Sequence, residues 1–289
     1  MKTHHRYATV DGHRLFYRTS GPANAPVIVL LHGYPSSSFM FRDLIPLLAE
    51  RYRVIAPDHL GFGLSDAPPI SEFTYTFESL AGLTKQLLDH LEVDRFAMYV
   101  HDYGAPIGWR LALEQPERIW AIVSQNGNVY EQGFDEDFWK PVWAYAHDEN
   151  PQTEAAVRGA LDLENIRWQY LHGEPDDSLV APETWLQDHQ RVNRPGNDLV
   201  QLQLTKDYIS NVKLYPSVHE YFRESQVPLL AAWGRNDGIF VPDGARAFLT
   251  DLPDAEVELF DGGHFLLESS ADRVADTMLQ FLSRSEGNT

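Results

Sequence analysis

The sequence contains no cysteine among its 289 residues. This absence excludes disulfide bonds and thiolate chemistry, and a zinc site would have to be built from histidine and carboxylate ligands alone. No long hydrophobic run is present either, since the polar residues 1–7 are not followed by an apolar segment of the length of a signal core or a membrane span. We therefore expect a cytoplasmic protein without a membrane partner.

Basic residues are also scarce, because 23 Lys and Arg oppose 42 Asp and Glu and give a formal net charge of -19. Such a charge repels phosphate backbones and anionic lipid surfaces, which argues against nucleic-acid and membrane partners. A small neutral substrate suits the charge better. The composition, with 43% hydrophobic residues, is that of a globular enzyme with a sizeable core.

Short runs rich in β-forming residues alternate with helix-like segments along much of the chain. Asp11-Gly12 is a strong hairpin-turn signal and predicts an antiparallel pair of strands at the start. The alternation that follows is typical of an α/β fold with a mostly parallel sheet. The sheet would have eight strands, six of them expected at residues 27–31, 53–56, 96–100, 121–124, 229–233 and 257–260.

Between about residues 127 and 223 this strand pattern disappears, and the segment is rich in Trp, Tyr, Glu and Gln at helical spacing. The pattern resumes at Pro228. We therefore expect one core domain formed by residues 1–126 and 227–289, with residues 127–226 inserted as a helical cap.

The run from residue 97 to residue 108 predicts a buried strand, a sharp turn at Asp102 and a helix that begins with small residues. A nucleophile at such a turn is exposed at the carboxyl end of the sheet, with a helix N-terminus behind it that favours negative charge. Gly104 would let the helix approach closely. The commoner role of an isolated Asp before a helix is that of an N-cap.

At this turn the chain resembles the α/β-hydrolase superfamily, and His101-Asp102-Tyr103-Gly104 is similar to the form found in epoxide hydrolases and haloalkane dehalogenases. Val100 departs from the small residue usual at that position. Other motifs of the superfamily occur in the expected order: His32-Gly33-Tyr34-Pro35, then Asp58 with Gly61, Gly63 and Ser65, then Gly234-Arg235-Asn236-Asp237, and finally Gly262-Gly263-His264.

The resemblance implies that Asp102 is the nucleophile, Asp237 the orienting acid and His264 the base. Backbone N–H groups of Tyr34 and Tyr103 would form the oxyanion hole. A carboxylate is already ionised at neutral pH and can attack an sp3 carbon directly, so His264 is free to activate the water that hydrolyses the resulting ester. These steps require no cofactor and no metal. Taken singly, Asp237 could be a turn residue and His264 a surface histidine.

An epoxide and a carbon–halogen bond both suit this nucleophile. Haloalkane dehalogenases usually bind halide with a tryptophan after the nucleophile and an asparagine in the oxyanion loop, and here those positions hold Tyr103 and Tyr34. Epoxide hydrolases usually protonate the epoxide oxygen with two cap tyrosines. The Tyr-x-x-Asn context favours Tyr208 for this role, and Tyr170 is its expected partner in preference to Tyr145 and His147.

The resemblance thus favours an epoxide hydrolase, and the aromatic-rich cap suggests an apolar or aromatic substrate that reacts with water. The alternatives are a haloalkane dehalogenase and an inactive ligand-binding protein with the same fold. Cap aromatic residues at helical spacing more often only pack a lid. Four cap tryptophans could still donate to a halide: Trp139, Trp143, Trp168 and Trp185.

Overall fold

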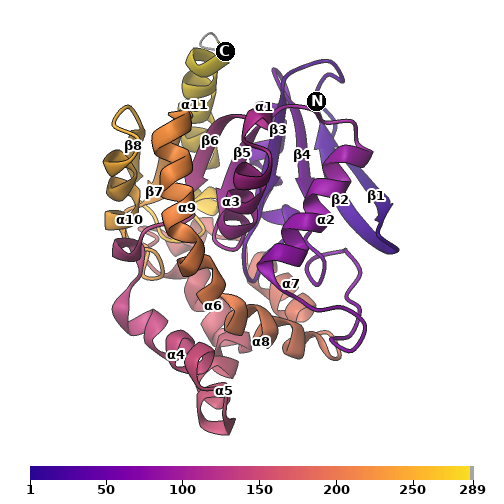
Figure 1. Ribbon diagram of the computed structural model, residues 1–289, viewed down its shortest axis with the longest axis vertical. Coiled ribbons are helices and arrows are strands. Elements are labelled where there is room, and N and C mark those ends of the chain that lie inside the picture. The colour runs from indigo at the N-terminus through magenta and orange to yellow at the C-terminus, as the bar shows by residue number, and fades with distance from the viewer. Residues whose placement is uncertain (287–289) are drawn as a thin grey trace.

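The computed structural model describes residues 1–286, which form one eight-stranded sheet in the order β1-β2-β4-β3-β5-β6-β7-β8 (Figure 1). β1 and β2 form an antiparallel hairpin, β2 also pairs with β4 in antiparallel fashion, and every later pair is parallel. The strands are β1 (His4–Val10), β2 (His13–Ser20), β3 (Val27–Leu31), β4 (Arg53–Pro57), β5 (Phe96–His101), β6 (Ile119–Gln125), β7 (Leu229–Gly234) and β8 (Glu256–Phe260). The predicted fold class and the eight strands are confirmed.

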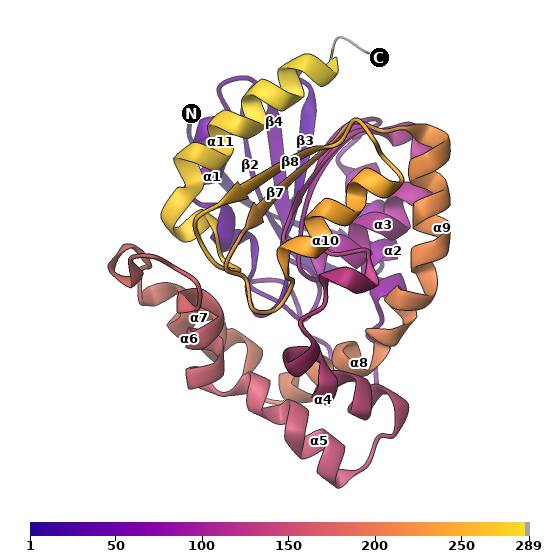
Figure 2. The same ribbon diagram turned by 90° about the vertical axis from the view of Figure 1, so that its left-hand side faces the viewer.

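Helices cover both faces of the sheet, as Figure 2 shows. One face carries α2 (Phe77–His90), α3 (Gly104–Glu114) and α10 (Pro242–Ala247), whereas the other carries α1 (Leu44–Leu48) and α11 (Leu267–Ser285). Each face has its own large apolar cluster. Because helices bury both faces, the central strand β5 is buried at every position and appears in the sequence as a continuous apolar run.

The segment between β6 and β7, which we call the cap below, contains no strand within residues 1–286, and most of its helices lie beyond the carboxyl edge of the sheet (Figure 2). They are α4 (Glu136–His147), α5 (Pro151–Arg158), α6 (Leu163–Leu171), α7 (Glu183–Val192), α8 (Asn197–Asp207) and α9 (Ile209–Ser225). Six short 3-10 helices complete the description: Ser38–Phe41, Pro116–Arg118, Glu131–Gly133, Gly159–Leu161, Asp177–Leu179 and Phe248–Thr250.

The last α-helix between β6 and β7, α9, also packs against the core. The Arg110 guanidinium on α3 donates hydrogen bonds to Asn211 Oδ1 at 2.8 Å and Ser210 Oγ at 3.0 Å. The rings of Trp109 and Phe222 meet edge to face between the same two helices. The chain therefore returns from the cap to β7 along a helix that is fixed to the sheet layer.

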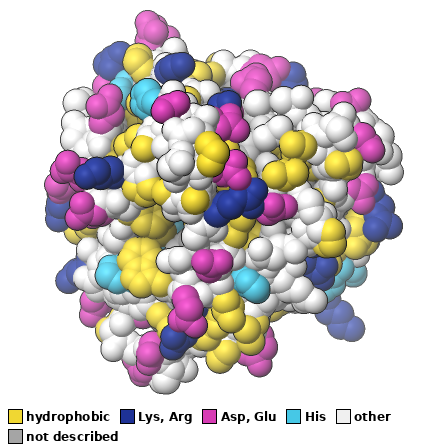
Figure 3. All heavy atoms as spheres, turned by 90° about the horizontal axis from the view of Figure 1, so that it is seen from below, with side chains coloured by type: hydrophobic (Ala, Val, Ile, Leu, Met, Phe, Trp, Pro, Cys, Tyr) yellow, Lys and Arg dark blue, Asp and Glu magenta, His cyan; other side chains and the backbone are white. Residues whose placement is uncertain are grey.

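The cap end of the surface carries acidic, basic and apolar side chains side by side (Figure 3). Its exposed large apolar residues include Trp168, Leu179, Leu186 and Leu199. No helix within residues 1–286 combines the length and the apolar character needed to cross a bilayer.

Candidate active site

The turn between β5 and α3 places Asp102 at the carboxyl end of the central strand. Its backbone is in the left-handed region, with φ of 47°, a strained conformation for a residue with a side chain. Gly104 makes this turn possible, because an added Cβ would lie 2.1 Å from the carbonyl oxygen of Leu31. Val100 fits because residue 108 is glycine, since a Cβ on Gly108 would lie 2.6 Å from Val100 Cγ1.

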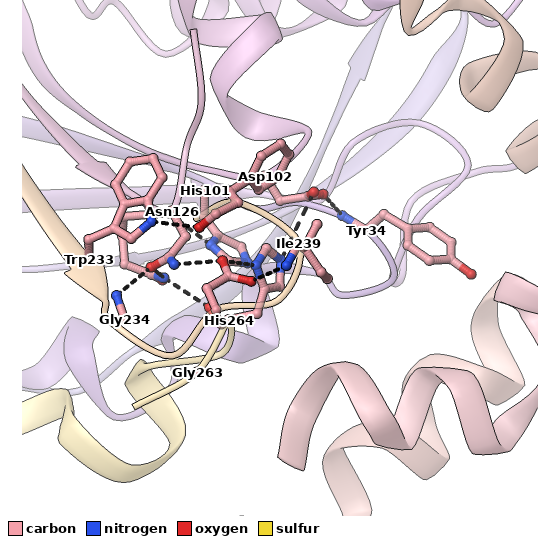
Figure 4. Close-up of polar contacts among 12 residues, drawn as sticks. Tyr34, His101, Asp102, Asn126, Trp233, Gly234, Ile239, Gly263 and His264 are labelled. Atoms are coloured by element: carbon pink, nitrogen blue, oxygen red, sulfur yellow. Dashed lines mark hydrogen bonds and ion pairs between the residues drawn. The ribbon is translucent and has the colours of Figure 1, made fainter. Parts of the chain in front are cut away.

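The loop after β3 holds one oxygen of the Asp102 carboxylate. The Tyr34 backbone N–H donates to Asp102 Oδ1 at 2.6 Å (Figure 4). Gly33 lies directly against the carboxylate, because an added Cβ would come within 2.3 Å of both Cβ and Oδ1 of Asp102. The loop can therefore reach the carboxylate only with glycine at position 33.

The loops after β7 and β8 bring Asp237 and His264 together. His264 Nδ1 donates to Asp237 Oδ2 at 2.8 Å, and the Ile239 N–H donates to Asp237 Oδ1 at 2.7 Å. Because the Asp237 carboxylate can only accept, Nδ1 carries the proton and Nε2 is left free to accept one. Nε2 lies 4.0 Å from Asp102 Oδ2 and has no hydrogen-bond partner among residues 1–286.

The electrostatic surroundings raise the pKa values of both Asp102 and His264. Burial raises the pKa of Asp102 to about 6, while the charge of His264 and the N–H groups of Tyr34 and Tyr103 oppose that rise. Burial lowers the pKa of His264, but the charge and hydrogen bond of Asp237, together with the charge of Asp102, outweigh burial and raise the pKa overall. Above pH 6 Asp102 is thus a desolvated anion, which is a stronger nucleophile than a hydrated one.

Sequence reasoning did not identify Asn126, which follows β6. Its Nδ2 donates to Asp237 Oδ2 at 2.6 Å, and its Oδ1 accepts from the Gly234 N–H at 3.0 Å (Figure 4). Its backbone has φ of 49°, a conformation that asparagine tolerates better than most residues. The available signal was Asn126-Gly127 at the carboxyl end of a parallel strand, where functional side chains gather.

A cavity of about 310 Å³ opens above Asp102, between the core and the cap. The core contributes Tyr34, Asp102, Tyr103 and Ile239, and the cap supplies the rest of the wall. Most cap residues are apolar, and the polar ones lie on α6 and α8 or at the rim. The cap lining consists of Asp137, Phe138, Trp139, Pro141, Val142, Ala156, Val157, Gly159, Ala160, Leu161, Asn165, Trp168, Gln169, Gln201, Leu202 and Thr205.

Two tyrosines of the core face this cavity. The Tyr34 hydroxyl donates to the carbonyl oxygen of Ala160 in the cap at 2.7 Å. Burial and the Asp102 charge raise the pKa of Tyr103, although a hydrogen bond with the Thr205 side chain opposes that shift. Both hydroxyls therefore connect the core to the cap.

Tyr208, the expected proton donor, is buried in the wall and is not one of the residues that line the cavity. Its ring lies 4.4 Å from that of Trp139 and 5.9 Å from that of Tyr103, measured between centroids. Burial, followed by the neighbouring Tyr215 and the Asp102 charge, raises its pKa well above the ordinary value. Tyr208 thus remains protonated close to Asp102.

The prediction that Tyr170 faces the site is wrong. Its ring stacks on Phe265 with centroids 3.9 Å apart, and its hydroxyl donates to the buried carboxyl group of Asp188. Tyr145 and His147, the weaker alternatives, do not line the cavity either. Of the four cap tryptophans only Trp139 and Trp168 do so, and Trp139 Nε1 already donates to the carbonyl oxygen of Ile239 at 2.9 Å.

The family model described as alpha/beta hydrolase fold matches residues 26–271. The chain therefore belongs to this family, and the α/β-hydrolase prediction is confirmed. It is 40% identical over 284 residues to the uncharacterized hydrolase YNR064C of Saccharomyces cerevisiae, covering 97% of each chain.

Two further relatives represent the branch that the Asp102 motif indicates. Haloalkane dehalogenase 2 of Mycobacterium bovis is 29% identical, over 92% of this chain and 91% of its own length. The solved structure of the epoxide hydrolase CorEH superposes with a TM-score of 0.77 at 23% identity, covering 98% of this chain and 99% of that one. The sequence likeness to a named dehalogenase agrees with the predicted dehalogenase and epoxide hydrolase branch, and the structural likeness shows the shared fold.

Proposed function

We propose that the protein hydrolyses epoxides to vicinal diols through an alkyl ester of Asp102. One observation carries the proposal: one oxygen of a buried carboxylate is held by the Tyr34 N–H, while the other lies 4.0 Å from His264 Nε2, which has no hydrogen-bond partner in the described part of the chain. The nucleophile needs no deprotonation, and the base does not contact it. This arrangement suits two successive half-reactions, formation of an ester and then its hydrolysis.

In the first step Asp102 Oδ2 attacks an epoxide carbon, and the bond between that carbon and the ring oxygen breaks. The oxygen remains attached to the neighbouring carbon and takes a proton. We assign this proton to Tyr208, whose ring packs behind the cavity lining 5.9 Å from the ring of Tyr103, the residue after the nucleophile, and whose phenol stays protonated. The product of the step is a hydroxyalkyl ester of Asp102, and tyrosinate takes its proton back from water.

In the second step His264 Nε2 takes a proton from water, and the oxygen of that water attacks the carboxyl carbon of Asp102. The Tyr34 and Tyr103 N–H groups receive the developing oxyanion, and Asp237 stabilises the imidazolium. Collapse of the tetrahedral intermediate breaks the bond between the carboxyl carbon and the ester oxygen. His264 gives its proton to the departing alkoxide oxygen, and the diol leaves. Asp102 is released as the carboxylic acid and loses its proton to solvent, which neutralises the hydroxide formed when tyrosinate was reprotonated.

The choice of an epoxide over a haloalkane depends on the donors around the carboxylate. Halide needs N–H donors, yet the side chains nearest the oxyanion loop are the phenols of Tyr34 and Tyr103, and the Trp139 indole N–H is already used within the protein. A dehalogenase remains the second candidate because Trp168 also lines the cavity and named dehalogenases are among the relatives.

The test is a comparison of products. The purified protein is incubated with 1,2-epoxyhexane or 1-bromohexane, and diol and bromide are quantified, with Asp102→Asn as the inactive control. We expect diol from the epoxide at a rate that the control loses by at least about 10³-fold. Bromide release without diol formation would replace the proposal with a dehalogenase. If neither compound is turned over, the remaining possibilities are a ligand-binding protein and an enzyme that acts on another electrophile.

A further inference from the structure

Two glutamine side chains from different cap helices line the cavity. Gln169 lies on α6 and Gln201 on α8, with exposed fractions of 4% and 3%. They stand among apolar neighbours such as Val157, Leu161 and Leu202. Neither residue has a part in the two half-reactions described above.

The amide of Gln201 has no hydrogen-bond partner among residues 1–286, since both Oε1 and Nε2 are buried and unpaired. Buried amides are nearly always paired in native proteins, so an unpaired one at a cavity wall indicates that a ligand supplies the missing partner. Gln203, two residues further along α8, shows the ordinary arrangement, because its Oε1 accepts from the Tyr75 N–H at 3.1 Å.

The position of Gln201 on α8 relates it to the nucleophile. Thr205 follows it by one helical turn, also lines the cavity and forms a hydrogen bond with the Tyr103 phenol. A line of polar groups therefore runs along the wall from the residue next to Asp102 to the amide of Gln201. Apolar side chains form most of the rest of the cap lining, and its other polar residues are Asp137, Asn165 and Gln169.

We infer that Gln201, assisted by Gln169, is a specificity-determining residue that binds a neutral hydroxyl or carbonyl oxygen of the substrate, away from the carbon that Asp102 attacks. The inference rests on the proposed function and narrows it to epoxides that carry a second oxygen function on an apolar body. An amide supplies both donors and an acceptor, so it suits a neutral group. The net charge of -19 and Asp137 at the rim disfavour an anionic one.

The experiment compares Gln201→Leu with wild type on a homologous series of ω-hydroxy-1,2-epoxyalkanes, each matched with the 1,2-epoxyalkane of equal length. Gln190→Leu, at an exposed glutamine of α7, is the control. In wild type we expect kcat/KM to favour the hydroxylated member of at least one pair by about tenfold. In Gln201→Leu the two members of each pair should have kcat/KM values within about twofold of each other, whereas Gln190→Leu should keep the wild-type preference.

Thermal unfolding without substrate distinguishes a binding role of Gln201 from a structural role. Replacing an unpaired buried amide by leucine leaves Tm unchanged or raises it, whereas a glutamine that holds the cap together would lower Tm when replaced. No preference at any chain length, or a preference that survives in Gln201→Leu, overturns the inference.

Binding separates failure of the inference from failure of the proposed reaction. Ligand-observed NMR on Asp102→Asn, with and without Gln201→Leu, measures affinity for the same pairs without turnover. If the hydroxylated member binds more tightly, if this preference depends on Gln201, and if wild type turns over neither member, the results support the subsite and reject the epoxide reaction. Turnover of epoxides without a hydroxyl preference rejects the subsite alone.

Discussion

His264 Nε2 lies 4.0 Å from Asp102 Oδ2 and makes no hydrogen bond with either carboxylate oxygen. A base that had to deprotonate its nucleophile would need to contact it directly, at about 2.6–3.2 Å. The separation seen here fits a base that acts on water after the nucleophile has already reacted. The two half-reactions should therefore be separable by mutation.

Asn126 should affect the second half-reaction more than the first, because it contacts Asp237 and not the nucleophile. Asn126→Gly keeps the left-handed backbone accessible while removing the amide. We expect ester hydrolysis to slow by about tenfold or more, a part of the ~10²–10⁴-fold that a general base contributes. Intact-mass analysis during turnover should then detect an accumulated ester. Slower ester formation with no accumulation would contradict this positioning role.

Gly33 should tolerate no side chain, because a Cβ there would overlap Asp102 Cβ and Oδ1. Gly33→Ala should lower kcat by about 10²-fold or more, since a displacement of the nucleophile by even 1 Å is costly. The control is Gly82→Ala on α2, where an added Cβ meets nothing within 4 Å. The control should keep its activity and gain about 0.5–1 kcal/mol of stability. Equal kinetics for both variants would refute the predicted contact.

The pH dependence follows from the raised pKa of Asp102. Only the ionised carboxylate attacks, so kcat/KM for an epoxide should rise with pH through about 6 and level off above it. In His264→Gln the midpoint of ester formation should move to higher pH, because the charge of His264 no longer lowers the pKa of Asp102. Stopped-flow ester formation at a series of pH values measures both. A midpoint near 4, as for an exposed aspartate, would count against a desolvated nucleophile.

Tyr208 and Tyr170 should behave differently. Tyr208→Phe removes the assigned proton donor and should slow ester formation with an epoxide by about 10²-fold, with little effect on a bromoalkane, whose leaving group needs no proton. Tyr170→Phe removes a contact with Asp188, and neither residue lines the cavity, so it should leave epoxide kinetics within about threefold. Single-turnover rates test both variants. Normal epoxide kinetics in Tyr208→Phe would reject the assignment of that residue.

The sheet and the positions of Asp102, Asp237 and His264 could be predicted because each depends on local patterns in the sequence. Strand β5 is a continuous apolar run followed by a turn that demands a small residue at Gly104, and the other two residues follow strands directly. Strand ends were less predictable: β6 was expected at residues 121–124 and extends from Ile119 to Gln125.

Which cap side chains face the cavity was harder to predict, because the rotation of each helix about its own axis depends on tertiary packing. Adjacent helical positions point about 100° apart, so on α6 Gln169 lines the cavity while Tyr170 packs on Phe265 in the opposite layer. Asn126 was missed for a related reason. Its role requires β6 and β7 to be neighbours and Asp237 to fold back over them, and no spacing in the sequence records that adjacency.

The most direct measurement traps the covalent intermediate in His264→Gln. After incubation with an epoxide, the intact mass should increase by the entire mass of that epoxide, because ring opening loses no atoms, and peptide mapping should place the adduct on Asp102. The additional change Asp102→Asn should abolish it. An unchanged mass, an adduct on another residue, or an alkyl adduct formed only from a bromoalkane would contradict epoxide opening by this carboxylate.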